Sequence, residues 1–304
     1  MRFGIWISPQ WPWEDSLEVA RHCEATGWDS LYVADHFMPN GPGPEPLDGD
    51  SLECWSVISA IAAAVPRMRL APLVTSVTYR HPAVLANMAA AVDRISNGRL
   101  TLGLGAGWQE NEHASYGLQL GTLKERMDRF EEAVEVVTSM LRQPRTTFNG
   151  SYFRLTDAPN QPTPVQERLP ILIGGGGEKR TLRIAARWAD EWNYWSTPDV
   201  LAHKVAVLRS HCEDVGRDPS DIAVSTQALL MLSTDESWLA DKRSGDRTRP
   251  LIVGTPQEVV GIVEEYARAG ADELIIPGFN LGPASRTKDT CDLFISEVAS
   301  HFRS

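Results

Sequence analysis

The chain has 304 residues, a formal net charge of -11 at pH 7 and a pI near 5.1. The electrostatic field of a protein with this net negative charge repels nucleic-acid backbones and anionic membrane surfaces. We therefore expect neither as a partner and expect a small-molecule substrate instead. The sequence has no apolar run of about eighteen residues and no hydrophobic signal segment after Met1, which predicts a cytoplasmic protein.

Eight short apolar runs have the composition of strands. They cover residues 2–7, 30–34, 70–77, 100–105, 170–174, 191–195, 222–232 and 273–277. Amphipathic helical patterns separate them, with apolar stripes that start at Leu85 and Met127, and a capping box at Thr255 and Glu258 that begins another helix. Strands that alternate with helices form a parallel sheet, and eight units favour an α/β fold of the (β/α)8 TIM-barrel type. A doubly wound open sheet is the alternative.

Three connections are longer than simple turns, namely residues 38–50, 143–169 and 233–253. We interpret them as insertions after strands two, four and seven of a single barrel domain that spans residues 1–304. Long loops in compact folds are commonly functional, and loops that follow barrel strands surround the active site. The first and third are therefore candidate lids.

Four consecutive glycines, Gly174 to Gly177, stand between the strand 170–174 and a helical pattern that starts near Leu182. Glycines allow backbone N–H groups to approach a phosphate closely, and the positive end of the following helix attracts its charge. The pattern predicts an anion-binding turn. The alternative is a flexible loop that binds nothing.

Polar residues follow the carboxyl ends of the other predicted strands, and these ends meet at one mouth of a barrel. Asp35 and His36 follow the second strand, where a histidine can exchange a proton near neutral pH and a carboxylate can bind a ligand. Alternating glycines in 103–107 would let a flat ring lie against the backbone, beside Trp108 and Asn111. Since Trp108 occupies the third glycine position of G-x-G-x-x-G, a dinucleotide fingerprint is not matched.

Other chemistries find little support in the sequence. It lacks both G-x-S-x-G and H-E-x-x-H, and its cysteines show no C-x-x-C spacing, so we expect reduced, partly buried thiols. Glu110, Glu112 and His113 could hold a metal, but acidic residues are common in the first turn of a solvated helix, which we prefer. We therefore expect no metal site. Of the ten tryptophans, Trp6, Trp108, Trp192 and Trp195 are placed near the mouth.

The blocks 32–37, 75–83, 93–107 and 174–177, together with 189–193, resemble those of bacterial-luciferase-like flavin or deazaflavin oxidoreductases over almost the whole chain. Within that superfamily the chain most resembles proteins assigned to the deazaflavin coenzyme F420. The resemblance implies hydride transfer between C5 of F420 and a small organic substrate, in an enzyme that is often a homodimer. Two alternatives remain: an FMN-dependent monooxygenase that uses reduced flavin and dioxygen, and a non-catalytic flavin- or deazaflavin-binding protein.

The resemblance also implies roles for particular residues. His36 stands near the reactive carbon as the catalytic proton donor or acceptor, and Ser76-Val77 forms a bulge with a non-proline cis peptide that braces the middle ring. Trp108 stands where sugar-phosphate dehydrogenases of the family carry an acidic residue, which favours a flatter or more apolar substrate. The expected cofactor-binding residues are Asp35, Thr75, Ser76, Val77, Ala106, Gly107, Trp108, Asn111, Gly174, Gly175, Gly176, Gly177, Glu178 and Trp195.

The densest basic cluster comprises Lys242, Arg243, Arg247 and Arg249. We prefer to interpret it as a solvated loop, because runs of charge usually face water. The alternative is a clamp for the acidic tail of F420 or for an anionic substrate.

Overall fold

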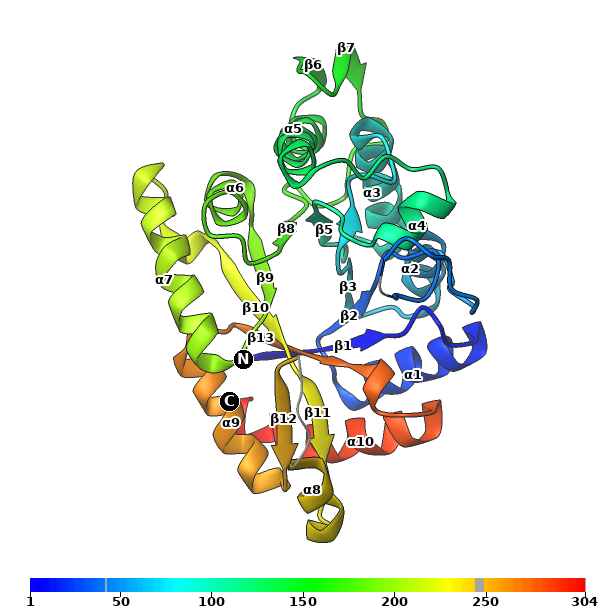
Figure 1. Cartoon of the computed structure of the whole chain (residues 1–304), viewed down its shortest axis with the longest axis vertical. Coiled ribbons are helices and arrows are strands. Elements are labelled where there is room, and N and C mark those ends of the chain that lie inside the picture. The colour runs from blue at the N-terminus through cyan, green and yellow to red at the C-terminus, as the bar shows by residue number, and fades with distance from the viewer. Residues whose placement is uncertain (42, 244–248, 304) are drawn as a thin grey trace.

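A parallel barrel with helices on its outside forms the centre of the computed structural model, which describes residues 1–41, 43–243 and 249–303 (Figure 1). The strands of the barrel sheet follow the order β3-β2-β1-β13-β10-β9-β8-β5-β4. Their bounds are β1 Arg2–Ile7, β2 Ser30–Val33, β3 Arg69–Pro72, β4 Thr75–Ser76, β5 Leu102–Gly105, β8 Ile171–Gly174, β9 Glu191–Trp195, β10 Ala223–Gln227 and β13 Glu273–Pro277. All eight predicted runs contain a barrel strand, so the predicted α/β barrel is confirmed.

The predicted third strand is broken into β3 and β4, and this break closes the barrel. β3 pairs with β2, whereas β4 pairs with β5. The peptide bond between Leu73 and Val74, in the gap between the two pieces, is cis. One predicted strand thus supplies both edges of the sheet, which is why nine strands occupy eight positions around the barrel.

Helices cover the outside of the barrel and bury the apolar stripes that the sequence indicates. Their bounds are α1 Trp13–Thr26, α2 Cys54–Ala64, α3 Pro82–Ser96, α4 Glu110–Ser115, α5 Leu123–Arg142, α6 Thr181–Trp188, α7 Pro198–Asp214, α9 Pro256–Arg268 and α10 Ala284–Glu297. The predicted capping box at Thr255 and Glu258 is present at the start of α9. Within the described ranges, none of the helices combines the length and the apolar character that a membrane crossing requires.

Two of the three long connections form structure that differs from the expectation. Residues 145–159 form an antiparallel hairpin, β6 Arg145–Asn149 with β7 Arg154–Pro159, in which Leu155 packs on Ala86 of α3 and Met140 of α5. The segment 143–169 is therefore not an insertion at the mouth, because it follows α5 and lies against the outer helices (Figure 1).

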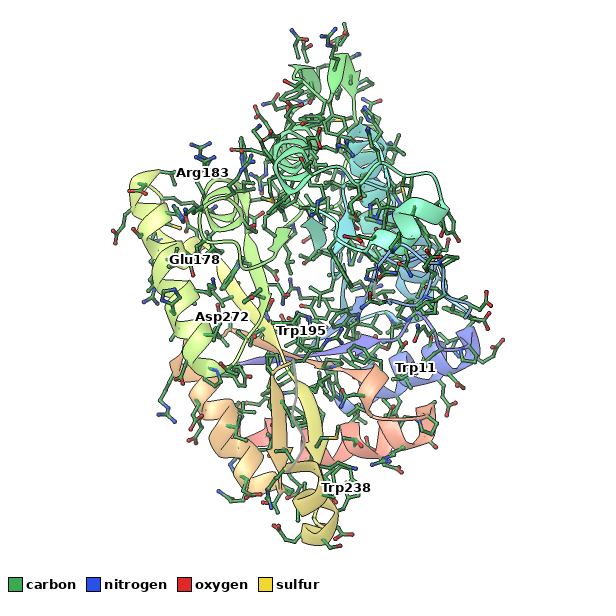
Figure 2. All side chains as sticks on the ribbon, viewed as in Figure 1. Trp11, Glu178, Arg183, Trp195, Trp238 and Asp272 are labelled. Atoms are coloured by element: carbon green, nitrogen blue, oxygen red, sulfur yellow. The ribbon has the colours of Figure 1, made fainter. Side chains whose placement is uncertain are left out.

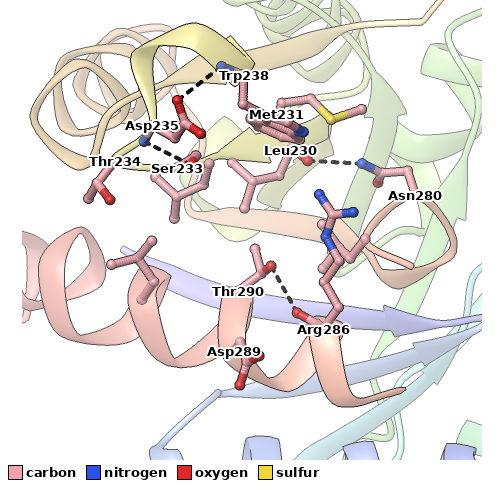
Figure 3. Close-up of a pocket in the computed structure, with 13 residues that line it drawn as sticks. Leu230, Met231, Ser233, Thr234, Asp235, Trp238, Asn280, Arg286, Asp289 and Thr290 are labelled. Atoms are coloured by element: carbon pink, nitrogen blue, oxygen red, sulfur yellow. Dashed lines mark hydrogen bonds between the residues drawn. The ribbon is translucent and has the colours of Figure 1, made fainter. Parts of the chain in front are cut away.

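The segment after the seventh strand leaves the barrel. The predicted run 222–232 is interrupted at Ala228, and β11 Leu229–Leu232 pairs with β12 Leu251–Gly254 instead of with a barrel strand. The helix α8 Glu236–Arg243 lies between them in sequence. A cavity of about 360 Å³ separates this insertion from α10, lined by Trp238, Asn280 and Arg286 among others (Figure 3).

The first residues of four strands close the opposite end of the barrel with ion pairs. Arg69 pairs with Glu191 and Glu273, and the Arg2 Nε donates to Glu273 Oε2 at 3.1 Å. Tyr32 donates its hydroxyl to the buried Glu273 at 2.8 Å. Burial raises the pKa of Glu273, against the opposing effect of Arg2 and Arg69. The end of the barrel at which its strands begin is therefore filled by polar side chains, and the carboxyl ends of the strands remain for a site.

Candidate active site

A bulge at the carboxyl end of the broken third strand shapes the barrel mouth. A side chain added at Gly105 would lie 2.5 Å from Val74 Cγ2, and one at Gly174 would lie 2.9 Å from Val74 Cγ1. The two glycines thus leave room for Val74, which packs against the inner cluster of the barrel. The expected non-proline cis bond is present, but it joins Leu73 to Val74 rather than Ser76 to Val77. The bulge lies where the strand changes its pairing partner. The apolar sequence does not indicate this position.

Asp35 connects the end of β2 to the segment after the bulge. Its buried carboxylate accepts hydrogen bonds from the Ser76 backbone N–H at 3.1 Å and from the two Nη atoms of Arg80 at 2.7 and 3.0 Å. Burial raises the pKa of Asp35, and the hydrogen bonds from Arg80 oppose that rise without cancelling it. Asp35 therefore positions the residues beside it, and its contact with a cofactor stays a prediction.

His36 is held by a buried carboxylate from another part of the chain. Its Nδ1 lies 2.8 Å from Glu112 Oε1, and Glu112 Oε2 accepts the Phe37 backbone N–H at 2.7 Å. The hydroxyl of Tyr79 also donates to Glu112. The Nε2 atom of His36 has no partner among the described residues, and Trp108 lies edge-on to the ring with centroids 5.6 Å apart. This arrangement fixes the ring and leaves Nε2 available to a substrate.

Glu112 and His113 contradict our interpretation of a solvated helix start. Their exposed fractions are 0% and 2%, whereas Glu110 is exposed as expected. Glu110 and Glu112 are two residues apart in α4, so they face different directions, and this spacing is a signal that could have separated them. His113 is held by the Gln109 carbonyl and by Thr78, each at 2.6 Å. The sequence analysis therefore missed the residue that holds His36.

Burial raises the pKa of Glu112, but the hydrogen bonds from His36, Tyr79 and the Phe37 amide outweigh burial and bring it below the usual range. A depressed carboxylate pKa contributes stability above the unfolded-state value, and that contribution is lost as the pH falls through the folded-state value. We expect Glu112→Gln to lower the free energy of unfolding by about 1–3 kcal/mol near pH 7. The difference in Tm from wild type should shrink in acid below about pH 4, since glutamine does not titrate. A constant difference across that range would contradict this account.

The glycine run forms a turn between β8 and α6. Gly175 has a φ of +122°, donates its N–H to the Asn193 carbonyl at 2.9 Å and accepts a hydrogen bond from Trp192 Nε1 at 2.9 Å. A side chain at Gly176 would lie 2.5 Å from the Tyr194 ring. Within the described residues, the N–H groups of Gly176 and Gly177 have no acceptor. The turn therefore presents backbone donors that a phosphate could accept.

Two neighbours of the turn, Trp192 and Glu178, have structural roles. The position of Trp192 corrects a prediction. Trp192 is fully buried beneath the turn, so it does not line the mouth. Glu178 is labelled beside α7 in Figure 2. Its Oε1 accepts a hydrogen bond from Lys204 at 2.6 Å and lies 3.0 Å from His203, and both of these residues are on α7. The hydrogen bond from Lys204 lowers the pKa of Glu178. Glu178 therefore holds the turn against α7.

Several other expected cofactor residues already have partners within the chain. Asn111 donates from Nδ2 to the Pro39 carbonyl at 3.1 Å and accepts the Glu112 N–H at 2.9 Å, so it holds the segment 38–50. Thr75 accepts a hydrogen bond from Trp55 Nε1 at 3.1 Å. Ser76 lies beside Gly107, Val77 is buried in the outer core and Ala106 packs against that core. These contacts position the strand ends, and direct contact with a cofactor stays a prediction.

Three aromatic rings gather at the ends of β1, β9 and β13. The centroid of Trp6 lies 5.8 Å from that of Trp195 and 5.7 Å from that of Phe279. The guanidinium carbon of Arg249 lies 5.3 Å from the Trp195 centroid and 5.6 Å from the Phe279 centroid. Arg249 is exposed in a bend, as the solvated-loop interpretation predicts, and its guanidinium also packs on the two rings.

The rest of the basic cluster lies apart from these rings. Arg243 ends α8 and pairs with Glu236 and Glu258, so it is not in a loop. Lys242 pairs with Asp241 on the same helix. Arg247 lies outside the described residues.

Residues 1–243 match the model of a family described as luciferase-like monooxygenase. The chain is 33% identical over 301 residues to an F420-dependent glucose-6-phosphate dehydrogenase of Amycolatopsis mediterranei, covering 87% of this chain and 88% of that protein. It is 31% identical over 195 residues to a pyrimidine monooxygenase of Yersinia enterocolitica, covering 62% of this chain and 50% of that protein. The F420-dependent tetrahydromethanopterin reductase from Methanopyrus kandleri superposes with a TM-score of 0.84 over 99% of both chains. At 19% identity, that likeness shows the fold alone.

Proposed function

Because this chain belongs to the luciferase-like monooxygenase family and is an oxidoreductase, we propose that it uses coenzyme F420 to transfer a hydride to or from a small organic substrate. The observation that carries the proposal is the fixed imidazole of His36 in a barrel with a glycine turn. Among the described residues, neither Nε2 of His36 nor the N–H groups of Gly176 and Gly177 have a partner. The Amycolatopsis mediterranei relative, which is matched over 87% of this chain and 88% of its own length, is named for the same coenzyme.

The residues at the mouth fit a phosphorylated tricyclic group. The amides of Gly176 and Gly177 would hold its phosphate, and Val74 would support its ring. Buried polar atoms without partners among the described residues include Trp6 Nε1 and Gln227 Oε1, a donor and an acceptor that suit a ring with carbonyl and N–H groups. When bound, F420 supplies the carbon that exchanges the hydride.

The chain's own residues handle the proton. Nε2 of His36 donates or accepts it at the substrate, and Glu112 keeps the ring in one orientation. Trp108 is half exposed beside His36. It presents an indole at the position where, as the resemblance implies, sugar-phosphate dehydrogenases of the family carry an acidic residue. We therefore propose a flatter or more apolar substrate than glucose 6-phosphate.

Cofactor binding tests the proposal directly. We expect F420 to bind at least about tenfold more tightly than FMN in parallel equilibrium titrations, a difference of about 1.4 kcal/mol. Tighter binding of FMN, with dioxygen-dependent turnover of its reduced form, would instead support a monooxygenase, the activity that the Yersinia relative's name describes. Tight F420 binding without turnover of any substrate would support the non-catalytic alternative.

The role of the glycine turn has its own test. Gly177→Asp places a negative charge where the phosphate is expected, so it should weaken F420 binding by about tenfold or more. A deazaflavin riboside without a phosphate is the matched probe, and its affinity should not change. Equal weakening of both ligands would mean that the substitution disturbs the ring site, and unchanged F420 binding would exclude the turn as the phosphate site.

A further inference from the structure

We propose that Arg249 binds a carboxylate on the substrate, whose flat apolar part lies among the rings of Trp6, Trp195 and Phe279. The proposal rests on the proposed function, because it places the substrate at the same barrel mouth. It goes further by assigning the chemical class of the substrate: an aromatic or otherwise planar carboxylate.

Arg249 lies beside aromatic rings from the carboxyl ends of the barrel strands. Trp6 lies near the carboxyl end of β1 and Phe279 follows the neighbouring strand β13. Trp195 (Figure 2) ends β9, which β10 separates from β13. Both Trp195 and Phe279 lie within 5.6 Å of the Arg249 guanidinium carbon. Stacking on an aromatic ring fixes the plane of a guanidinium. Its N–H donors lie at the edge of that plane, so they stay free to bind a planar oxyanion.

The charge of Arg249 carries the second step. Among the described residues no carboxylate pairs with it, whereas Arg243 pairs with Glu236 and Glu258, and Arg80 pairs with Asp35 and Glu53. In a chain with a net charge of -11, an arginine held by aromatic rings rather than by a carboxylate remains available to an anion. Its fork of donors matches a carboxylate with two parallel hydrogen bonds.

The surroundings carry the third step. Trp6 packs on the inner cluster of the barrel, and its buried Nε1 has no acceptor in the described part of the chain. Phe279, one of the two rings beside Arg249, is 37% exposed and therefore faces solvent. An exposed aromatic ring beside a cation that has no carboxylate partner among the described residues suits a ligand with a flat body and one anionic group.

Benzoate and its neutral analogue benzamide provide the test, in ligand-observed NMR titrations of the full-length protein with and without F420. We expect wild type to bind benzoate and the Arg249→Gln variant to bind it at least tenfold more weakly, with little change for benzamide. Arg243→Gln removes the same charge from a paired arginine and should match wild type within about twofold. Arg249→Lys keeps the charge but not the planar fork, so it should recover only part of the affinity.

Three outcomes would overturn the proposal. Wild type and Arg249→Gln could bind benzoate equally, or wild type could fail to bind it. Arg249→Gln could instead lose affinity for F420 while benzoate binding persists, in which case the arginine serves the acidic tail of the cofactor. Because the titrations without F420 do not depend on the cofactor, their failure is distinguishable from failure of F420 to bind.

Discussion

Replacing His36 with alanine is expected to lower turnover by about 10²–10⁴-fold while leaving the affinity for F420 nearly unchanged. The expectation follows from geometry, because Glu112 holds Nδ1 and leaves Nε2 as the atom that can exchange a proton at the mouth. Steady-state turnover and equilibrium cofactor titration of the same preparation would separate the two effects. His36→Gln should be almost as slow, since an amide cannot carry the proton.

His22→Ala is the matched control, because His22 is a surface histidine that also pairs with a carboxylate, Asp292, but lies on an outer helix. It should keep wild-type turnover. If His36→Ala turned over at the wild-type rate, His36 would have no part in proton transfer. If it lost F420 affinity to the same extent as turnover, its role would be binding.

Gly103→Ala should remove at least about 3 kcal/mol from the free energy of unfolding, the upper range for overpacking in a protein core. The added methyl carbon would lie 2.0 Å from the Pro72 carbonyl oxygen and 3.1 Å from Val74. The carbonyl belongs to the main chain, so it cannot rotate away as a side chain could. Denaturant unfolding, with soluble yield as a second measure, would report the loss.

Gly261→Ala makes the same chemical change where space is open. Gly261 lies inside α9 with no atom within 4 Å of an added Cβ, so alanine should stabilise the protein by about 0.5–1 kcal/mol. Both variants alter the unfolded chain equally, and their difference therefore reports the native contact at residue 103. A Gly103→Ala protein as stable as wild type would mean that the junction of β3 and β5 can expand.

Local patterns were enough to predict most of the barrel. The strands at 2–7, 191–195 and 273–277 match their predicted bounds, because each is a short apolar run next to a helical pattern. The break in the run 70–77 and the departure of β11 after Ala228 were not predictable in this way. Both depend on which strand pairs with which, and residues on either side of each break are equally apolar.

The candidate site shows the same difference between features set by residues adjacent in sequence and features set by distant contacts. His36 and the glycine turn were found because the relevant residues are adjacent in sequence. Glu112 was missed because its partner lies 76 positions away. The spacing of Glu110 and Glu112 indicates that they face different directions, but it does not say which of them is buried. The aromatic support of Arg249 was also invisible, since its rings come from the ends of β9 and β13.

The ion pairs among Arg2, Arg69, Glu191 and Glu273 have a consequence for the order of events in turnover. Because they plug the far end of the barrel, and Tyr32 and Leu172 fill the interior above them, ligands have one route in and one route out. Under the proposed function, we expect a cofactor seated deeper in that route than the substrate to bind first and to be exchanged only after the product departs. The single open end of the barrel would therefore set the order of ligand binding and release, and no individual catalytic residue would need to enforce it.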